Sequence, residues 1–269
     1  MIEHGLETLI TKIEAREYLH LIKVKPAQSS VNFLRDIIKG TLTTIPFNNL
    51  AMLTRPKIAP TKKEIKKDML TGLGGLCTTI NPFLCALLHQ LGFKVNLLSA
   101  SIMKPDSHIV LMVNIANLDY WVDLGNGFPY LEPLPLINKA EASHPFLKWR
   151  LIKQNDEWHV QHCLSHDPTW RTNQIFLPIP RNYSFFSQMR KDHYSIPDYG
   201  PFLTGIRINR WHDNGGVLMR DQFAWSIPGK KEHVNFEQAT NWIIKHFDES
   251  ADLLTRLLSE SWDILELKK

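Results

Sequence analysis

The hydrophobic pattern of this chain changes near residue 93, and that change constrains the fold more than any other feature. Before it, apolar residues recur at the three- and four-residue spacing of helices. After it, short runs rich in Val, Ile, Leu and aromatic residues alternate with polar turns. Helices, then strands, then strands with terminal helices predict an α+β fold of about three subdomains.

Local signals mark several helix ends. A helix is expected over about residues 2–20, and Ser29 or Ser30 is expected to cap the next one. Thr61 and Glu64 have the spacing of a capping box and begin a further helix. We expect strands and closing helices over the following ranges: strands 95–102, 108–115, 120–124, 149–152, 158–160, 206–209, 217–219 and 223–227, and helices 235–247 and 251–265. Residues 169–205 are expected to be irregular.

The composition excludes several classes of protein. Apolar residues make up 43% and charged residues 22%, which is typical of a globular protein with a buried core. The formal charge of +4 comes from scattered basic residues, so we expect no nucleic-acid partner. No run resembles a signal peptide or a membrane span. Three cysteines do not make a disulfide framework, and a cytoplasmic protein with no membrane partner is expected.

Cys77 is the candidate nucleophile. It follows Gly74-Gly75-Leu76 and opens an apolar helix, where the positive end of the helix dipole favours the thiolate. The glycines would let a substrate approach the sulfur. A buried structural cysteine is the competing interpretation, and it is retained for Cys85 and Cys163.

His108 and Asp123 are candidates for the base and for the group that orients it. His108 opens the apolar run 109–113, and Asp123 ends the next one. If these strands pair about the turn at 116–118, the two side chains become neighbours across the ladder. A carboxylate among apolar residues is costly unless it is paired. The sequence therefore predicts a Cys–His–Asp triad, although an Asp123 that faces solvent at a strand end is the alternative.

Four segments resemble the arylamine N-acetyltransferase family. They are Pro46-Phe47-Asn48-Asn49-Leu50, Gly74-Gly75-Leu76-Cys77 with Asn81, Ser107-His108-Ile109-Val110-Leu111, and Trp121-Val122-Asp123-Leu124-Gly125. The similarity continues through 176–180, 192–197 and 218–223, and so covers nearly the whole chain.

The resemblance implies a fold and a chemistry. The fold would have a papain-like Cys–His–Asp core in three parts: a helical bundle over 1–92 that carries the nucleophile, a β-barrel over 93–190 that carries His108 and Asp123, and an α/β lid over 191–269. Cys77 would take acetyl from acetyl-CoA and pass it to an arylamine, a hydrazine or a related amine. No permanently bound cofactor and no metal are implied; acetyl-CoA is a cosubstrate. The oligomeric state is left open.

The resemblance also points to substrate contacts. Phe47, Phe128 and Phe202 would line the acceptor pocket, although plain core packing accounts for each equally well. Lys104 and Pro105 would contact CoA.

The sequence departs from the family pattern beside the nucleophile. Leu73 replaces an Arg, Thr79 replaces a Glu, and Asn48 replaces another Glu. Loss of both members of a charge pair avoids leaving one charge buried alone. Asn126 replaces an aromatic residue, whose space Phe128 could fill.

Three alternatives to acetyl transfer from acetyl-CoA stay open. The first is an amide synthase of the same family that takes its acyl group from a carrier-protein or other thioester. The second is a papain-like or transglutaminase-like hydrolase, which would lack the Pro-Phe-x-Asn-Leu and Asp-x-Gly segments present here. The third is an inactive relative that serves as a binding module.

Overall fold

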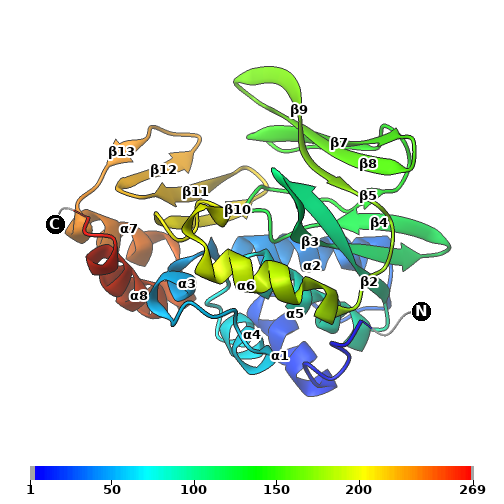
Figure 1. Cartoon of the computed structure of the whole chain (residues 1–269), viewed down its shortest axis with the longest axis horizontal. Coiled ribbons are helices and arrows are strands. Elements are labelled where there is room, and N and C mark those ends of the chain that lie inside the picture. The colour runs from blue at the N-terminus through cyan, green and yellow to red at the C-terminus, as the bar shows by residue number, and fades with distance from the viewer. Residues whose placement is uncertain (1–3, 268–269) are drawn as a thin grey trace.

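The computed structural model describes residues 4–267, apart from the side chain of Glu249, and places a helical bundle beneath two antiparallel sheets (Figure 1). The bundle comprises α1 (Lys12–Leu21), α2 (Val31–Thr44), α3 (Leu50–Thr54), α4 (Lys62–Leu70) and α5 (Cys77–Gln90). The expected α+β fold, with its bundle, its barrel-like sheet and its third α/β part, is confirmed. In the part of the chain that the structure describes, no helix has the length and apolar character needed to span a membrane.

Side-chain caps set where the helices of the bundle begin. Ser30 caps α2, and the capping box of Thr61 and Glu64 begins α4, as predicted. The prediction of a helix from about residue 2 was wrong in its start, because Thr11 and Glu14 form a further capping box that begins α1 at Lys12. Ile13, the second residue of α1, is 70% exposed.

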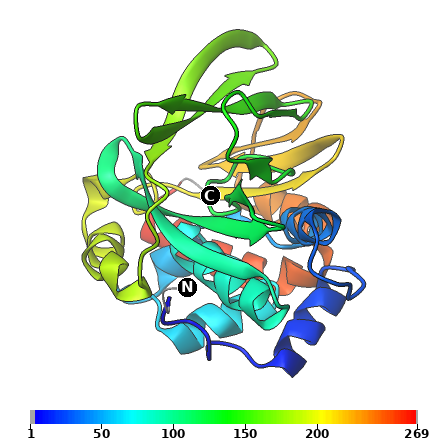
Figure 2. The same ribbon diagram turned by 90° about the vertical axis from the view of Figure 1, so that its right-hand side faces the viewer.

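Eight strands form the larger sheet, in the order β5-β4-β3-β2-β9-β8-β7-β6. Their bounds are β2 (Lys94–Ile102), β3 (Lys104–Ile115), β4 (Leu118–Val122), β5 (Leu134–Pro135), β6 (Glu141–Ser143), β7 (Leu147–Gln154), β8 (Glu157–Leu164) and β9 (Asp167–Phe176). The sheet curls into a nearly closed barrel above the helices (Figure 2).

The segment 169–205 is not irregular, and that prediction was wrong. It contains most of β9, the helix α6 (Ser187–Ser195) and the short 3-10 helices η1 (Tyr183–Phe186) and η2 (Pro197–Tyr199). Most of β9 is polar and at least partly exposed, so its hydrophobic pattern is weak. Its backbone pairing with β8 and β2 makes it a strand.

The hairpin of β3 and β4 has the predicted form. Ala116 and Asn117 both adopt positive φ angles, 51° and 64°, which suits a tight two-residue hairpin turn. Leu111 lies opposite Val122, so the end of β4 lies beside the middle of β3. The hairpin therefore fixes the position of His108, which lies within β3 and not at its start, relative to Asp123, which follows β4.

The smaller sheet joins the two ends of the chain. It comprises β1 (Phe47–Asn48), β10 (Arg207–His212), β11 (Gly215–Arg220), β12 (Phe223–Ile227) and β13 (Glu232–His233), and it is followed by α7 (Phe236–His246), η3 (Asp248–Ser250) and α8 (Ala251–Ile264). β1, from the N-terminal third, pairs with β10. The proposed division after residues 92 and 190 stays a prediction: the first point lies in the turn after α5, and the second lies within α6.

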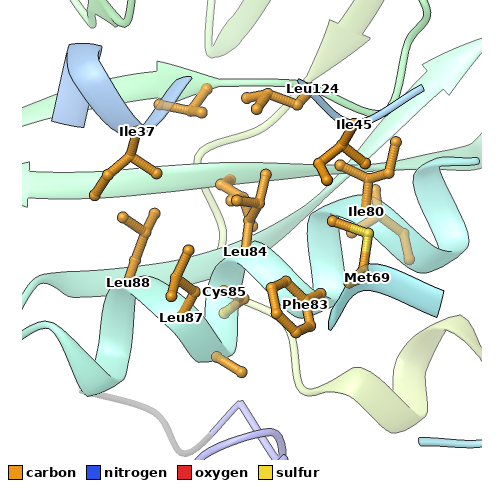
Figure 3. Close-up of a cluster of buried hydrophobic side chains, with 14 of the residues drawn as sticks. Ile37, Ile45, Met69, Ile80, Phe83, Leu84, Cys85, Leu87, Leu88 and Leu124 are labelled. Atoms are coloured by element: carbon orange, nitrogen blue, oxygen red, sulfur yellow. The ribbon is translucent and has the colours of Figure 1, made fainter. Parts of the chain in front are cut away.

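Helix α5 is the central element of the main core. Its first twelve residues are buried, so the helix is enclosed on every side. Its side chains meet α2, α4 and the strands of the barrel, as Figure 3 shows for Leu84, Leu88 and Ile80. Each fully buried side chain of this size contributes about 1.5–3 kcal/mol. The N-terminus of α5, and with it Cys77, is therefore firmly held.

Candidate active site

Cys77 is the first residue of α5 and is 4% exposed. The turn before it requires glycine: Gly74 has φ +76°, and a Cβ there would lie 2.0 Å from the Pro46 carbonyl oxygen. The N-cap residue Leu76 offers no side-chain hydrogen bond. The first backbone amides of α5 therefore have no side-chain acceptor from the N-cap residue. They lie at the N-terminal end of the helix, where the Cys77 sulfur is also located.

Gly125, just after β4, lies against the nucleophile. A Cβ on Gly125 would stand 2.4 Å from the Cys77 Cα and 2.8 Å from the Asn81 amide nitrogen. No other residue fits this position without moving the backbone of α5 or of the strand end. This contact couples the helix that carries the sulfur to the strand that carries the carboxylate.

His108 and Asp123 lie together as the sequence predicted. The His108 Nε2 is 2.8 Å from the Asp123 Oδ2, and both residues are buried. Because Nε2 faces the carboxylate, Nδ1 is the ring nitrogen left for Cys77. Burial opposes a charge on His108, but Asp123 and Cys77 outweigh it and raise the pKa of the imidazole to about 10.

Asp123 accepts hydrogen bonds at both carboxylate oxygens. Oδ1 accepts from Asn81 at 2.9 Å and from the Gly125 amide at 3.0 Å, and Oδ2 accepts from Gln174 at 2.9 Å. Burial by itself raises the pKa of this carboxyl, but His108, Asn81 and Gln174 bring it below its ordinary value. The site therefore holds a buried carboxylate, oriented from three different elements.

Two of these supporting residues were not assigned roles from the sequence. Asn81 lies four residues after Cys77 and so on the same face of α5, a spacing that could have indicated its role. It also donates to the Ile109 carbonyl at 2.6 Å and accepts from the Leu124 amide at 3.2 Å. Gln174 lies on β9, in the segment taken as irregular, and no sequence signal marked it.

The triad opens into a pocket of about 590 Å³, which Cys77 and His108 line. Phe128 and Phe202, two of the predicted acceptor contacts, line it. Phe47 does not line the pocket. The centre of its ring is 6.0 Å from the centre of the Phe202 ring, and the ring packs against Gly127. His193, which the sequence analysis did not single out, also lines the pocket.

The two predicted CoA contacts lie differently. Lys104 lines the pocket; its ammonium donates to the Asp198 carbonyl at 2.9 Å and lies 4.6 Å from the centre of the Tyr199 ring. Pro105 is exposed beside it and is not among the lining residues. Lys104 thus connects β3 to the η2 segment across the pocket.

The residues that replace charged residues of the family pattern are uncharged, and they pack consistently with one another. Asn48 donates to the Leu73 carbonyl at 2.6 Å and accepts from the Leu50 amide at 3.1 Å. Leu73 is buried in an apolar cluster. A charge pair is nevertheless present nearby: Arg55 makes two hydrogen bonds of 2.6 Å to Asp68, and both line a small cavity that Thr79 shares.

Comparison with known proteins decides the family. The model of the family described as N-acetyltransferase matches residues 30–248. The chain belongs to the N-acetyltransferase family. Since these enzymes transfer acetyl groups from acetyl-CoA, the expectation of an acetyl-CoA-dependent N-acyltransferase is confirmed. The resemblance read from the four segments is confirmed with it.

Relatives of this N-acetyltransferase include enzymes with different names. The uncharacterized acetyltransferase YvcN of Bacillus subtilis is 31% identical over 197 residues, covering 69% of this chain and 76% of that one. Proansamycin X synthase of Amycolatopsis mediterranei is 24% identical over 244 residues, covering 84% of this chain and 89% of that one.

Solved structures share the fold of this N-acetyltransferase. The Mycobacterium marinum arylamine N-acetyltransferase in complex with CoA has a TM-score of 0.80 at 19% identity, covering 93% of this chain and 99% of that one. A Bacillus cereus arylamine N-acetyltransferase with a Cys-His-Glu catalytic triad has a TM-score of 0.75 at 20% identity, covering 87% and 97%. This chain has Asp123 as the carboxylate paired with His108.

Proposed function

We propose that this N-acetyltransferase acetylates an arylamine, a hydrazine or a related amine by a ping-pong route through a Cys77 thioester. The observation that carries the proposal is the position of Cys77, at the start of a buried helix and beside a His108–Asp123 pair 2.8 Å apart. A nucleophile, a base and an orienting carboxylate in one buried group are what acyl transfer through cysteine requires.

In the first half-reaction the Cys77 sulfur attacks the acetyl carbonyl of acetyl-CoA. The bond between the acetyl carbon and the CoA sulfur breaks, and His108 gives its proton to the departing sulfur. Because the pKa of His108 is raised to about 10, the ring is charged at neutral pH and holds the proton needed for this step. Backbone amides at the start of α5 would stabilise the oxyanion.

In the second half-reaction the amine nitrogen attacks the Cys77 thioester. The carbon–sulfur bond breaks, the amine proton passes to His108, and the thiolate–imidazolium pair is restored. Asp123 keeps the imidazole in position throughout, and Asn81 and Gln174 keep Asp123 in position. The apolar lining of the pocket, with Phe128 and Phe202, suits an aromatic acceptor.

Intact mass of the protein, incubated with acetyl-CoA and no amine, tests this function. We expect a gain of one acetyl group, absent in Cys77→Ala and lost when an arylamine or a hydrazine is added. A retained adduct in Cys77→Ala would contradict Cys77 as the nucleophile. Alkylation by iodoacetamide near neutral pH should meanwhile label Cys77, which lines the pocket, much faster than Cys85 and Cys163.

A second candidate is an amide synthase that takes its acyl group from another thioester. Proansamycin X synthase, which aligns with 84% of this chain, favours this candidate. An enzyme whose Cys77 alkylates rapidly, resists acetyl-CoA and is acylated by a carrier-protein thioester would support it. An inert Cys77 would instead indicate a binding module that has lost its activity.

A further inference from the structure

A second histidine occupies the same pocket on the wall opposite His108. His193 lies in the last turn of α6, is 5% exposed, and lines the pocket together with Cys77. The wall it belongs to consists of α6, η2 and the residues that follow. The sequence gives this histidine no part in the triad, and the proposed route through Cys77, His108 and Asp123 does not use it.

Aromatic side chains surround the His193 ring. Its centre is 5.2 Å from that of Phe202, 5.7 Å from that of Tyr199 and 6.0 Å from that of Tyr194, each at a steep angle. A phenylalanine would make the same edge contacts without any polar atom to satisfy. Packing therefore does not explain why the ring carries nitrogen.

The two ring nitrogens of His193 have different surroundings. Nδ1 is buried and has no hydrogen-bond partner among the described residues, which is unfavourable for a polar atom. Nε2 points toward the segment that follows η2: it lies 3.8 Å from the place that a Cβ on Gly200 would occupy, and Gly200 lines the pocket. With the proton on Nδ1, the lone pair of Nε2 is available to a molecule in the pocket.

His193 is uncharged under the conditions in which His108 is charged. Burial, and then the positive charge of His108, lower the pKa of His193 to about 4. At neutral pH the ring can therefore accept a hydrogen bond, which the charged His108 cannot do before it has released its proton.

We propose that His193 contacts the acceptor substrate and accepts a hydrogen bond at Nε2 from an N–H of the incoming amine. The amine needs at least two N–H groups, or a second nitrogen as in a hydrazine or a hydrazide, so that one hydrogen is held by His193 while another passes to His108. The bond orients the nitrogen lone pair toward the thioester carbon on Cys77. No proton moves to His193, so the chemistry of both half-reactions is unchanged. This inference rests on the proposed function.

The test uses the two half-reactions separately, with His193→Phe and His193→Gln. The first variant keeps a ring and removes both nitrogens, and the second keeps a hydrogen-bond acceptor. Each protein is acetylated with acetyl-CoA, freed of excess donor, and mixed with an arylamine or a hydrazide, while intact mass follows gain and loss of the acetyl group. Melting temperatures show whether either variant has lost its fold.

We expect both variants to be acetylated within about threefold of the wild-type rate. His193→Phe should then discharge its acetyl group to the amine about tenfold or more slowly, with a raised half-saturating amine concentration, and His193→Gln should recover most of that loss. A His193→Phe enzyme that discharges at the wild-type rate would overturn the assignment. So would equal slowing of both half-reactions, which indicates a structural role alone. If the wild-type protein takes up no acetyl group, the proposed function itself fails, and the role of His193 fails with it.

Discussion

The two walls of the pocket place a histidine beside the nucleophile in opposite electrostatic settings. On the barrel wall, His108 lies against a carboxylate that receives hydrogen bonds from Asn81, Gln174 and the Gly125 amide. On the α6–η2 wall, His193 lies among aromatic rings and has no carboxylate partner among the residues that the structure describes. The pKa of His108 is raised to about 10 and that of His193 is lowered to about 4. Burial is shared, so the neighbouring carboxylate decides which ring carries the charge.

The division of labour that follows is chemical. The barrel wall stores and returns a proton, for which a charged, oriented imidazole is required. The α6–η2 wall offers aromatic side chains around one available nitrogen of His193, which suits recognition of an aromatic amine. The predictions below test whether the carboxylate causes this difference.

The largest effect is expected for Asp123→Asn. The substitution keeps the size of the side chain, but it removes the charge that holds the His108 ring in its protonated, oriented state. We expect kcat to fall by about 10³–10⁴ with the fold intact, as for the equivalent change in a serine protease triad. Steady-state rates and circular dichroism spectra measure this. Activity within tenfold of the wild type would mean that the two walls do not differ through Asp123.

The dependence of stability on pH should differ between the two histidines. Because the pKa of His193 is lower in the folded than in the unfolded state, this group stabilises the fold. The stabilisation is fully present above the unfolded pKa of 6.5 and is lost as the pH falls toward the folded pKa of about 4. His108 has the opposite sign: its contribution is fully present below 6.5 and is lost as the pH rises toward its folded pKa of about 10.

Urea unfolding from pH 4 to pH 10 measures both signs. His193→Phe should flatten the acid limb of the stability curve, by at most roughly 3 kcal/mol, and leave the alkaline limb as it is. His108→Gln should flatten the alkaline limb instead. If both substitutions changed the pH dependence of stability in the same way, the two walls would not differ electrostatically.

The sequence predicts the barrel wall of the pocket but not the α6–η2 wall. The barrel wall was predictable because its strands are apolar, the Ala116-Asn117 turn is tight, and a buried Asp123 needs a partner. The α6–η2 wall was not, because α6 is polar and buries few residues, so its hydrophobic pattern is weak. His193 is positioned by packing against Tyr199 and Phe202, which are close in sequence but are brought around it only by the turn at η2.

The same reasoning applies to the supporting residues and to the start of the chain. Gln174 reaches Asp123 only because β9 pairs with β2 and β8, a long-range contact that local propensity does not encode. Helix α1 starts later than predicted because a capping box begins at Thr11. The sequence contains this capping box, but the prediction relied on the spacing of the apolar residues before it. Long apolar strands and helices were therefore predictable, and polar elements held by tertiary contacts were not.

Gly125→Ala should show how tightly the barrel wall is fitted to the nucleophile. The added Cβ would lie 2.4 Å from the Cys77 Cα, so the sulfur and the carboxylate must move apart. We expect a loss of about a hundredfold in the rate of Cys77 acylation, since displacements of about 1 Å have this effect. Gly92→Ala is a control: it has positive φ but nothing within 4 Å, and should lower stability without slowing acylation. Equal effects of the two substitutions would show that a general loss of stability, and not the contact with Cys77, is responsible.

The smallest effect is expected where the two walls are joined. Lys104 on β3 donates to the Asp198 carbonyl and lies over the Tyr199 ring, so it ties the barrel wall to η2 through contacts worth about 1 kcal/mol together. Lys104→Met keeps the length of the side chain and removes the ammonium. We expect amide hydrogen exchange in residues 196–204 to rise a few-fold, with kcat within about threefold of the wild type, and Lys104→Arg to restore protection. If Lys104 also contacts CoA, KM for acetyl-CoA rises in Lys104→Met as well. Unchanged exchange would mean that the two walls keep their positions independently, so that the difference between His108 and His193 would depend on each wall alone.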